Sequence, residues 1–183
     1  MRTQDNTQSY GWVSQVFHWG TFALFVALFV VANEMVDAPK GPDKFALYGI
    51  HKSLGITMFF VLFARISWRM ANPTPQDAEG SPLEAKAART LHFLLYAVLL
   101  IMPVSGMVMT FAGGHPVSWF GLVDLPNLIG ENKSLLETAK FAHQFAAYGL
   151  ITMLAGHVGA SLWHQFVRKD GVMKRMIPVL AEK

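Results

Sequence analysis

Four long apolar segments dominate this chain of 183 residues. They cover residues 13–36, 45–70, 90–112 and 139–167, and each holds the roughly 20 mostly apolar residues that a helix needs to cross a bilayer. Only 15% of the residues are charged, whereas a soluble domain averages about 25%. We therefore expect an all-α integral membrane four-helix bundle, a single domain over residues 1–183, with the lipid bilayer as its solvent.

Lys and Arg are divided unequally between the two ends of these segments. One side carries ten of them: Arg2, Arg65, Arg69, Lys86, Arg89, Arg168, Lys169, Lys174, Arg175 and Lys183. The other side carries five: Lys40, Lys44, Lys52, Lys133 and Lys140. Because the side richer in Lys and Arg faces the cytoplasm, we expect both termini to be cytoplasmic. The basic residues flank apolar segments and form no stripe, which argues against a nucleic-acid partner.

The chain contains no cysteine. This excludes disulfides, iron–sulfur clusters, thiolate metal sites and the covalent haem attachment motif C-x-x-C-H. Redox chemistry in such a chain requires histidine or methionine ligands or an organic cofactor. We also expect the first apolar segment to remain in the membrane, because no A-x-A-like cleavage site follows it.

Several histidines lie within the apolar segments, where an ionisable side chain is costly and therefore suggests a function. His143 and His157 are 14 residues apart, about 21 Å along a helix and close to four full turns. They therefore share a helix face but lie near opposite sides of the membrane. His164 lies about 10 Å further along nearly the same face.

The alternating direction of the segments places the other histidines at two depths. His51 is expected at the outer level with His143, and His18 at the inner level with His157. His92 and His164 lie near the inner level as well. Two imidazoles facing each other at one depth, twice over, can ligate two haems, since helix bundles build cofactor sites from inward-facing side chains. Proton relay and hydrogen bonding to a neighbouring helix are the alternative roles of such histidines.

Small residues accompany the proposed ligands, and they would either let a flat macrocycle approach the backbone or allow close helix packing. They are Gly20, Gly49, Gly55, Gly149, Gly156, Gly159 and Ala160. Arg65 follows His51 by 14 residues, so it is expected to face inward and pair with a haem propionate, unless it extends to the interface. Lys52 and Lys140 flank the outer site and have the same two alternatives.

An inner slot for a quinone is predicted from four residues that combine apolar surface with hydrogen-bond donors. These residues are His92, Trp163, His164 and Arg168. An outer location near Trp119 is an alternative that the sequence leaves open. His115 precedes a proline in the outer loop and is interpreted as a loop residue.

Taken together and in order, several short motifs resemble the bacterial cytochrome b561 family of di-haem membrane proteins, which includes superoxide oxidases. The motifs are FHWG in the first segment, GIHKSLG and FARISWR in the second, LHFLLY and MPVSGMVM in the third, and AHQFAAYGLITMLAGHVGASLWH in the fourth. The likeness covers nearly the whole chain. It implies two haem b groups, held at the inner site by His18 and His157 and at the outer site by His51 and His143.

The resemblance also implies electron exchange with membrane ubiquinone in the bacterial inner membrane and, in some members, oxidation of superoxide on the periplasmic side. The chain is thus expected to be a superoxide:quinone oxidoreductase. Lys52 and Lys140 are the candidate catalytic residues, because they would attract the superoxide anion at the outer mouth. The outer side as a whole sums to −1, so any attraction is local: its five lysines are opposed by Glu34, Asp37, Asp43, Asp124, Glu131 and Glu137.

Two other functions remain open at this point. Related b-type subunits carry electrons between quinone and another donor or a partner dehydrogenase, so a partner redox protein is one possibility. A non-redox transporter or proton channel with a histidine relay is the other.

Overall fold

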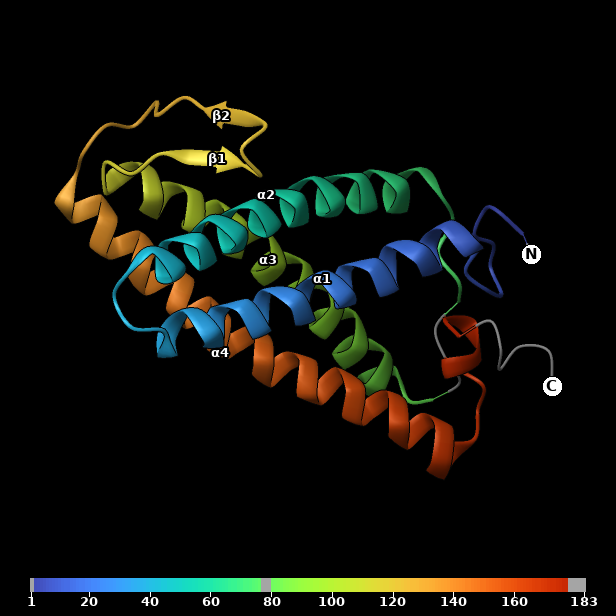
Figure 1. Ribbon diagram of the computed structural model, residues 1–183. Coiled ribbons are helices and arrows are strands. Elements are labelled where there is room, and N and C mark those ends of the chain that lie inside the picture. Colours follow the sequence, from blue (N-terminus) through green and yellow to red (C-terminus); the bar gives the residue numbers. More distant parts are fainter. Residues whose placement is uncertain (1, 77–79, 178–183) are drawn as a thin grey trace. The chain divides into compact units, whose positions relative to one another are not determined.

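The computed structural model describes residues 2–76 and 80–177 (Figure 1). Its long elements are four helices: α1 (Trp12–Asp37), α2 (Pro42–Ala71), α3 (Pro82–Ala112) and α4 (Lys133–Trp163). All four are long and apolar enough to cross a membrane, which confirms the predicted spans. A π-helical turn, η1 (His164–Arg168), continues α4, and a 3-10 turn, η2 (Met173–Arg175), follows it.

Two of the helices begin several residues earlier than the apolar segments predict, because polar caps extend them. At the start of α3 the amide of Glu84 donates to Ser81 Oγ and the amide of Ser81 donates to Glu84 Oε2, a reciprocal capping box. At the start of α4 the amide of Leu135 donates to Asn132 Oδ1. These polar turns add helix beyond the apolar part of each segment.

The connection between α3 and α4 contains a short antiparallel hairpin, which adds two strands to the expected all-α fold. Its strands are β1 (Val117–Trp119) and β2 (Val123–Leu125), with Trp119 paired to Val123. Phe120 and Gly121 form the turn with φ angles of 51° and 71°, the left-handed region that suits tight hairpin turns. The strands are too short for the apolar pattern to have predicted them.

Hydrogen bonds fasten this hairpin to α2. Ser53 Oγ accepts from the amide of Phe120 at 2.9 Å, and the indole nitrogen of Trp119 donates to Thr57 Oγ1 at 3.1 Å. Lys52 Nζ donates to the carbonyl of Pro116 at 3.2 Å. Ser53 is buried, so replacing it by a residue without a hydroxyl would leave the amide of Phe120 without this hydrogen bond and would destabilise the contact between α2 and the hairpin.

The chain divides into two compact units, and each helix begins in one unit and ends in the other. Unit 1 comprises residues 1–19, 63–98 and 148–183. Unit 2 comprises residues 20–62 and 99–147. The ten Lys and Arg positions expected to be cytoplasmic all belong to unit 1, although Lys183 lies outside the described residues, and the five others belong to unit 2.

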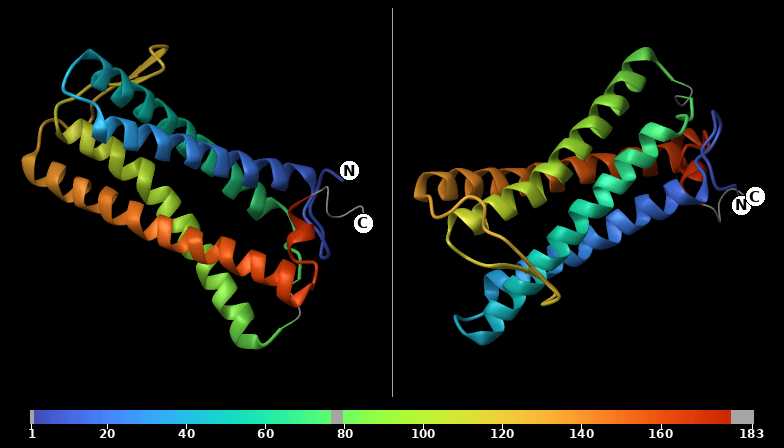
Figure 2. Two further views of the ribbon diagram at one scale, coloured as in Figure 1. Left: turned by 60° about the horizontal axis from the view of Figure 1, so that its bottom comes forward. Right: turned by 90° about the horizontal axis from the view of Figure 1, so that it is seen from above.

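In unit 1 the segment before α1 and the segment after α4 lie side by side (Figure 2). The indole nitrogen of Trp19 donates to the carbonyl of Met176 at 2.9 Å, and the side chain of Gln15 reaches the carbonyl of Arg175. The carboxylate of buried Asp5 accepts from the amide of Gly11 and from Ser14 Oγ, both at 2.7 Å. The segment before α1 and the segment after α4 are therefore both hydrogen-bonded to the first half of α1.

Large apolar side chains on all four helices are exposed, as expected for surfaces that face lipid. Examples are Phe29 at 46%, Phe60 at 60%, Phe93 at 71% and Phe145 at 70% exposed. The buried side chains of the helices include small ones, for example Thr21, Ser105 and Ala146, and larger ones, for example Leu62 and Leu150.

Candidate functional site

In unit 2 the rings of His51 on α2 and His143 on α4 face each other. Their centres are 6.3 Å apart and their planes are inclined by 76°. The structure therefore brings together the two histidines expected at the outer level. We call them the unit 2 pair.

One nitrogen of His143 is fixed by α3. Its Nδ1 lies 2.9 Å from the carbonyl oxygen of Met102 and 3.1 Å from Ser105 Oγ. A carbonyl oxygen can only accept, so Nδ1 carries the proton and Nε2 keeps its lone pair. This is the tautomer that a metal-ligating histidine requires, with the second nitrogen oriented by a neighbouring acceptor.

Gly106 provides the space for this ring. A Cβ at position 106 would lie 3.3 Å from Cε1 of His143, closer than an ordinary van der Waals contact. Pro103 lies one turn earlier in the same helix and removes one backbone donor there. The sequence MPVSG thus surrounds the His143 ring with the carbonyl of Met102, the hydroxyl of Ser105 and the space left by Gly106, which has no side chain.

His51 differs from His143. Its Nδ1 is buried and has no partner at hydrogen-bond distance among the described residues, although the backbone of Leu28 lies close enough to act on the ring as an acceptor. A buried nitrogen without a partner costs about 1–3 kcal/mol. A buried imidazole beside a second imidazole is compatible with ligand binding.

In unit 1 the ring of His157 on α4 lies near two other histidines. The centre of His18 on α1 is 6.2 Å away with the planes inclined by 51°, and the centre of His92 on α3 is 5.3 Å away at 71°. We call His18 and His157 the unit 1 pair. His92 is thus placed beside this pair as a third imidazole.

Arg65 is also part of this cluster. Its Nη2 lies 3.2 Å from Nδ1 of His18, and its guanidinium carbon lies 5.2 Å from the centre of the Tyr96 ring. A guanidinium can only donate, so Nδ1 of His18 accepts here and a neutral ring carries its proton on Nε2. For His18 to bind a metal through Nε2, the guanidinium must leave Nδ1 or the ring must turn.

The ring separations allow the fit of a metal-centred cofactor to be tested. A metal–imidazole bond is about 2 Å long and a ring nitrogen lies about 1 Å from the ring centre, so two imidazoles on opposite sides of one metal have centres about 6 Å apart. The two pairs, at 6.2 and 6.3 Å, match this value. The contact of His92 with His157, at 5.3 Å, is too short for it.

Among the described residues there is no group of three or more His, Cys, Asp or Glu side chains that could hold a metal ion by itself. Two protein ligands per metal are sufficient only when the other ligands belong to the cofactor. A macrocycle such as haem supplies four nitrogens in a plane and leaves two axial positions for histidine. The donor sets of both pairs therefore fit haem.

The helix glycines expected beside the histidines are not in close contact with a neighbouring helix. No atom lies within 4 Å of a Cβ built at Gly20, Gly49, Gly55, Gly156 or Gly159. At Gly149 the nearest atom is the end of the flexible Met153 side chain, at 3.9 Å. Gly20, Gly49, Gly156 and Gly159 are exposed, so the space beside them is open surface and gives no evidence for or against a cofactor.

The two lysines predicted near the outer mouth both belong to unit 2. Lys52 is half-buried and donates to the carbonyl of Pro116, while Lys140 is exposed on the first half of α4. Lys52 is thus fixed beside His51 by the loop that leads into the hairpin. Lys140 has the freedom of a surface side chain.

The four residues proposed for quinone are divided by the structure. His92 lies with the unit 1 pair. Trp163, His164 and Arg168 gather at the turn that ends α4, where the guanidinium of Arg168 lies 5.3 Å from the centre of the Trp163 ring. Two partners that sequence reasoning missed join them: Asp170, whose Oδ2 is 2.5 Å from His164 Nδ1, and Glu84, whose Oε2 is 3.0 Å from Arg168 Nη1.

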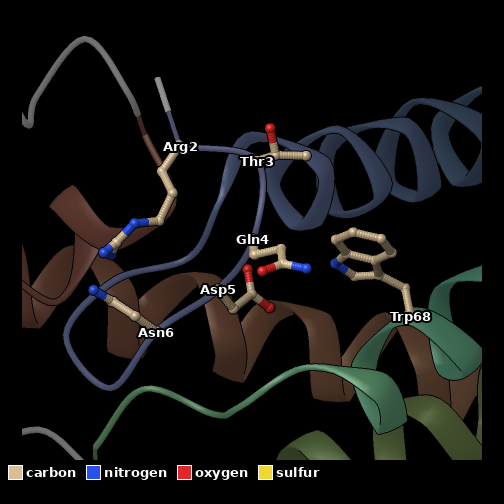
Figure 3. A pocket seen from close by; sticks show the side chains of 6 residues that line it. All are labelled: Arg2, Thr3, Gln4, Asp5, Asn6 and Trp68. Carbon is tan, nitrogen blue, oxygen red and sulfur yellow. The ribbon is translucent and has the colours of Figure 1, made fainter.

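A separate cavity of about 520 Å³ lies in unit 1 and is lined by Arg2, Thr3, Gln4, Asp5, Asn6 and Trp68 (Figure 3). The indole of Trp68 closes one side of it, opposite the first residues of the chain. No histidine lines it. It is therefore distinct from both histidine pairs.

Comparisons with known proteins identify the family of this chain. The family model described as prokaryotic cytochrome b561 matches residues 9–179. The chain is similar to cytochrome b561 homolog 2 of Escherichia coli K12, with 29% identity covering 97% of this chain and 95% of the relative. It is also similar to a protein of Yersinia pestis named probable superoxide oxidase CybB, with 27% identity covering 88% of this chain and 91% of the relative. The chain belongs to the prokaryotic cytochrome b561 family, whose members are membrane electron-transfer proteins that bind haem b.

Proposed function

We propose that this protein binds two haem b groups, oxidises superoxide on the periplasmic side of the inner membrane and reduces ubiquinone. His51 and His143 would hold one haem in unit 2, and His18 and His157 the other in unit 1. The observation that carries the proposal is the ring separation of 6.2 and 6.3 Å in two independent pairs.

Two histidines would hold each haem. A haem held by both histidines of a pair would supply one-electron transfer and would leave no free position for oxygen. The protein's own contribution is orientation: the Met102 carbonyl sets the tautomer of His143, and Gly106 leaves room for its ring. His143 and His157 lie on one continuous helix, so the two sites are joined by α4.

The sidedness of the proposal rests on charge. The positive-inside rule places unit 1, with ten of the fifteen Lys and Arg residues, on the cytoplasmic side. By the same rule the five other lysines would lie at the periplasmic surface, and two of them, Lys52 and Lys140, lie on the same helices as His51 and His143. Positive side chains beside an otherwise slightly acidic surface would concentrate a small anion locally.

The substrate is supported by the relative named probable superoxide oxidase. The alternative within the same family is a b-type cytochrome that passes electrons between quinone and another donor or a partner dehydrogenase. Both share the two-haem site and differ only in the electron donor. A histidine relay without haem is less well supported, because family membership assigns electron transfer.

One experiment separates these functions. Oxidised holoprotein in detergent is pulsed with superoxide, and haem reduction is followed at its α band with and without ubiquinone-1. Rapid reduction by superoxide, abolished by superoxide dismutase and followed by reoxidation when ubiquinone-1 is present, would support the proposal. Haems that superoxide fails to reduce but a quinol reduces would support the alternative electron carrier.

A further inference from the structure

His164 is held by a carboxylate at the end of α4. Its Nδ1 is 2.5 Å from Oδ2 of Asp170, and the two side chains are only 22% and 14% exposed. An ionised carboxylate can only accept, so Nδ1 carries a proton and Nε2 remains for another partner. A histidine oriented in this way by a carboxylate is prepared to exchange a proton through Nε2.

A π-helical turn creates this contact. The amide of Lys169 donates to the carbonyl of His164 at 2.7 Å, closing a turn of five residues, and Lys169 adopts a left-handed φ of 56°. The chain reverses there and brings Asp170 back to His164. Single π-helical turns inside helices are frequent at functional sites, and π-turns also end many α-helices, as this one ends α4.

The charged groups around His164 form a short network. Arg168 Nε lies 3.4 Å from the same Oδ2 of Asp170, and Arg168 Nη1 lies 3.0 Å from Oε2 of Glu84 on α3. Burial alone would raise the pKa of Asp170, but hydrogen bonds from His164 and from the amide of Val172 lower it below its ordinary value. Asp170 therefore stays ionised near neutral pH and can accept the hydrogen bond from Nδ1 of His164.

Apolar surface adjoins this network. Leu162, Trp163, Phe166 and Val167 are 43%, 44%, 68% and 66% exposed. A quinone dissolved in the bilayer could approach His164 along this surface, with its ring against the indole of Trp163.

We propose that His164 delivers a proton to the ubiquinone and that Asp170 is the positioning residue that holds it for this transfer. This inference rests on the proposed reduction of ubiquinone. Reduction adds two electrons, supplied by oxidation of two superoxide ions to oxygen, and two protons. The Nε2–H bond of protonated His164 breaks and an O–H bond forms on one quinone oxygen, while water supplies the proton for the other oxygen and then reprotonates His164.

The test uses holoprotein whose haems are reduced with dithionite and then mixed, without air, with ubiquinone-1 or with ferricyanide. Ferricyanide takes electrons without protons, so it reports electron transfer alone. D170N should slow reoxidation by ubiquinone-1 by about tenfold, less than the 10²–10⁴-fold of a lost general acid, with the apparent quinone affinity changed less than about twofold. The rate with ferricyanide should stay at the wild-type value, and D170E should restore part of the rate.

Two features of this test separate positioning from a merely structural role. A structural defect would slow the reaction with ferricyanide as well, and D170E would not repair it. Loss of positioning slows only the reaction with ubiquinone-1, which needs protons as well as electrons.

The outcomes distinguish the two proposals. If ubiquinone-1 reoxidises the wild type and D170N at the same rate, the role of Asp170 is overturned while quinone reduction stands. If ferricyanide reoxidises the wild type but ubiquinone-1 does not, quinone reduction and the inference built on it both fail.

Discussion

Nδ1 of His143 donates to the carbonyl oxygen of Met102 at 2.9 Å. This contact joins α4 to α3 at the point where α3 carries Pro103, Ser105 and Gly106. Because Nδ1 is held by a backbone carbonyl of a neighbouring helix, and not by a flexible side chain, the orientation of the ring and of its other nitrogen, Nε2, is set by α3. The position of the proposed ligand therefore depends on the geometry of α3.

Gly106→Ala should weaken haem binding in unit 2. The added Cβ would lie 3.3 Å from Cε1 of His143, so the ring must shift by a few tenths of an ångström. Displacing the support of a metal ligand costs about 10- to 100-fold in affinity, and we expect the lower end of this range. Haem retained during dialysis against apomyoglobin would measure it. Gly41→Ala is the matched control, since no atom lies within 4 Å of a Cβ there, and equal haem loss from both variants would contradict the expectation.

His51→Ala or His143→Ala should each remove the haem of unit 2 and leave that of unit 1. The haem content per polypeptide, measured by the pyridine haemochrome method, should fall by about half, because a haem with one axial histidine is bound far more weakly. His115→Ala removes an exposed loop histidine from the same unit and should leave the content unchanged. An undiminished content in both ligand variants would show that these residues are not the ligands.

Replacing Lys52 and Lys140 together by Gln should slow reduction by superoxide roughly threefold at low ionic strength and flatten its dependence on salt. The rate of haem reduction after a superoxide pulse, followed at several salt concentrations, provides the measurement. Lys40→Gln with Lys133→Gln removes the same charge from unit 2 at positions not adjacent to the histidine pair. Identical rates in all three proteins would exclude local steering by these lysines.

Asp170→Asn should destabilise the protein in a pH-dependent way. Burial raises and the hydrogen bond from His164 lowers the pKa of Asp170, with a net result below its ordinary value. A depressed carboxyl pKa adds stability above the unfolded-state value of about 4, and this stability is lost as the pH falls through the lower folded-state value. The difference in thermal stability between wild type and D170N should therefore persist from about pH 7 to 5 and shrink towards about pH 3. A constant difference over that range would show that ionised Asp170 does not contribute.

The sequence predicted the features that depend on burial in lipid. The four spans follow from the length of the apolar segments, and the proximity of the His51 and His143 rings follows from their common depth. That these pairs bind haem stays a prediction. The alternating direction of the helices gives the depth of each histidine in the membrane. Histidines at the same depth could then be paired, because a polar ring inside a membrane needs a partner at its own depth.

Other features depend on tertiary geometry that no periodicity records. The Met102 carbonyl is a backbone atom, and Asp170 reaches His164 only because a π-helical turn and a left-handed residue reverse the chain. The capping box of Ser81 and Glu84 was visible as S-x-x-E and would have moved the predicted start of α3 to its observed position. Arg65, expected to meet a propionate, lies against Nδ1 of His18, a contact that spacing alone does not indicate.

Haem stoichiometry combined with electron paramagnetic resonance of the purified, oxidised protein tests the two-pair arrangement most directly. Imidazole rings centred 6.2 and 6.3 Å apart in two separate units predict two haem b per polypeptide, both low-spin with two nitrogen ligands. A colourless protein after expression with ample haem, a single haem per chain, or a high-spin signal from an open axial position would contradict it.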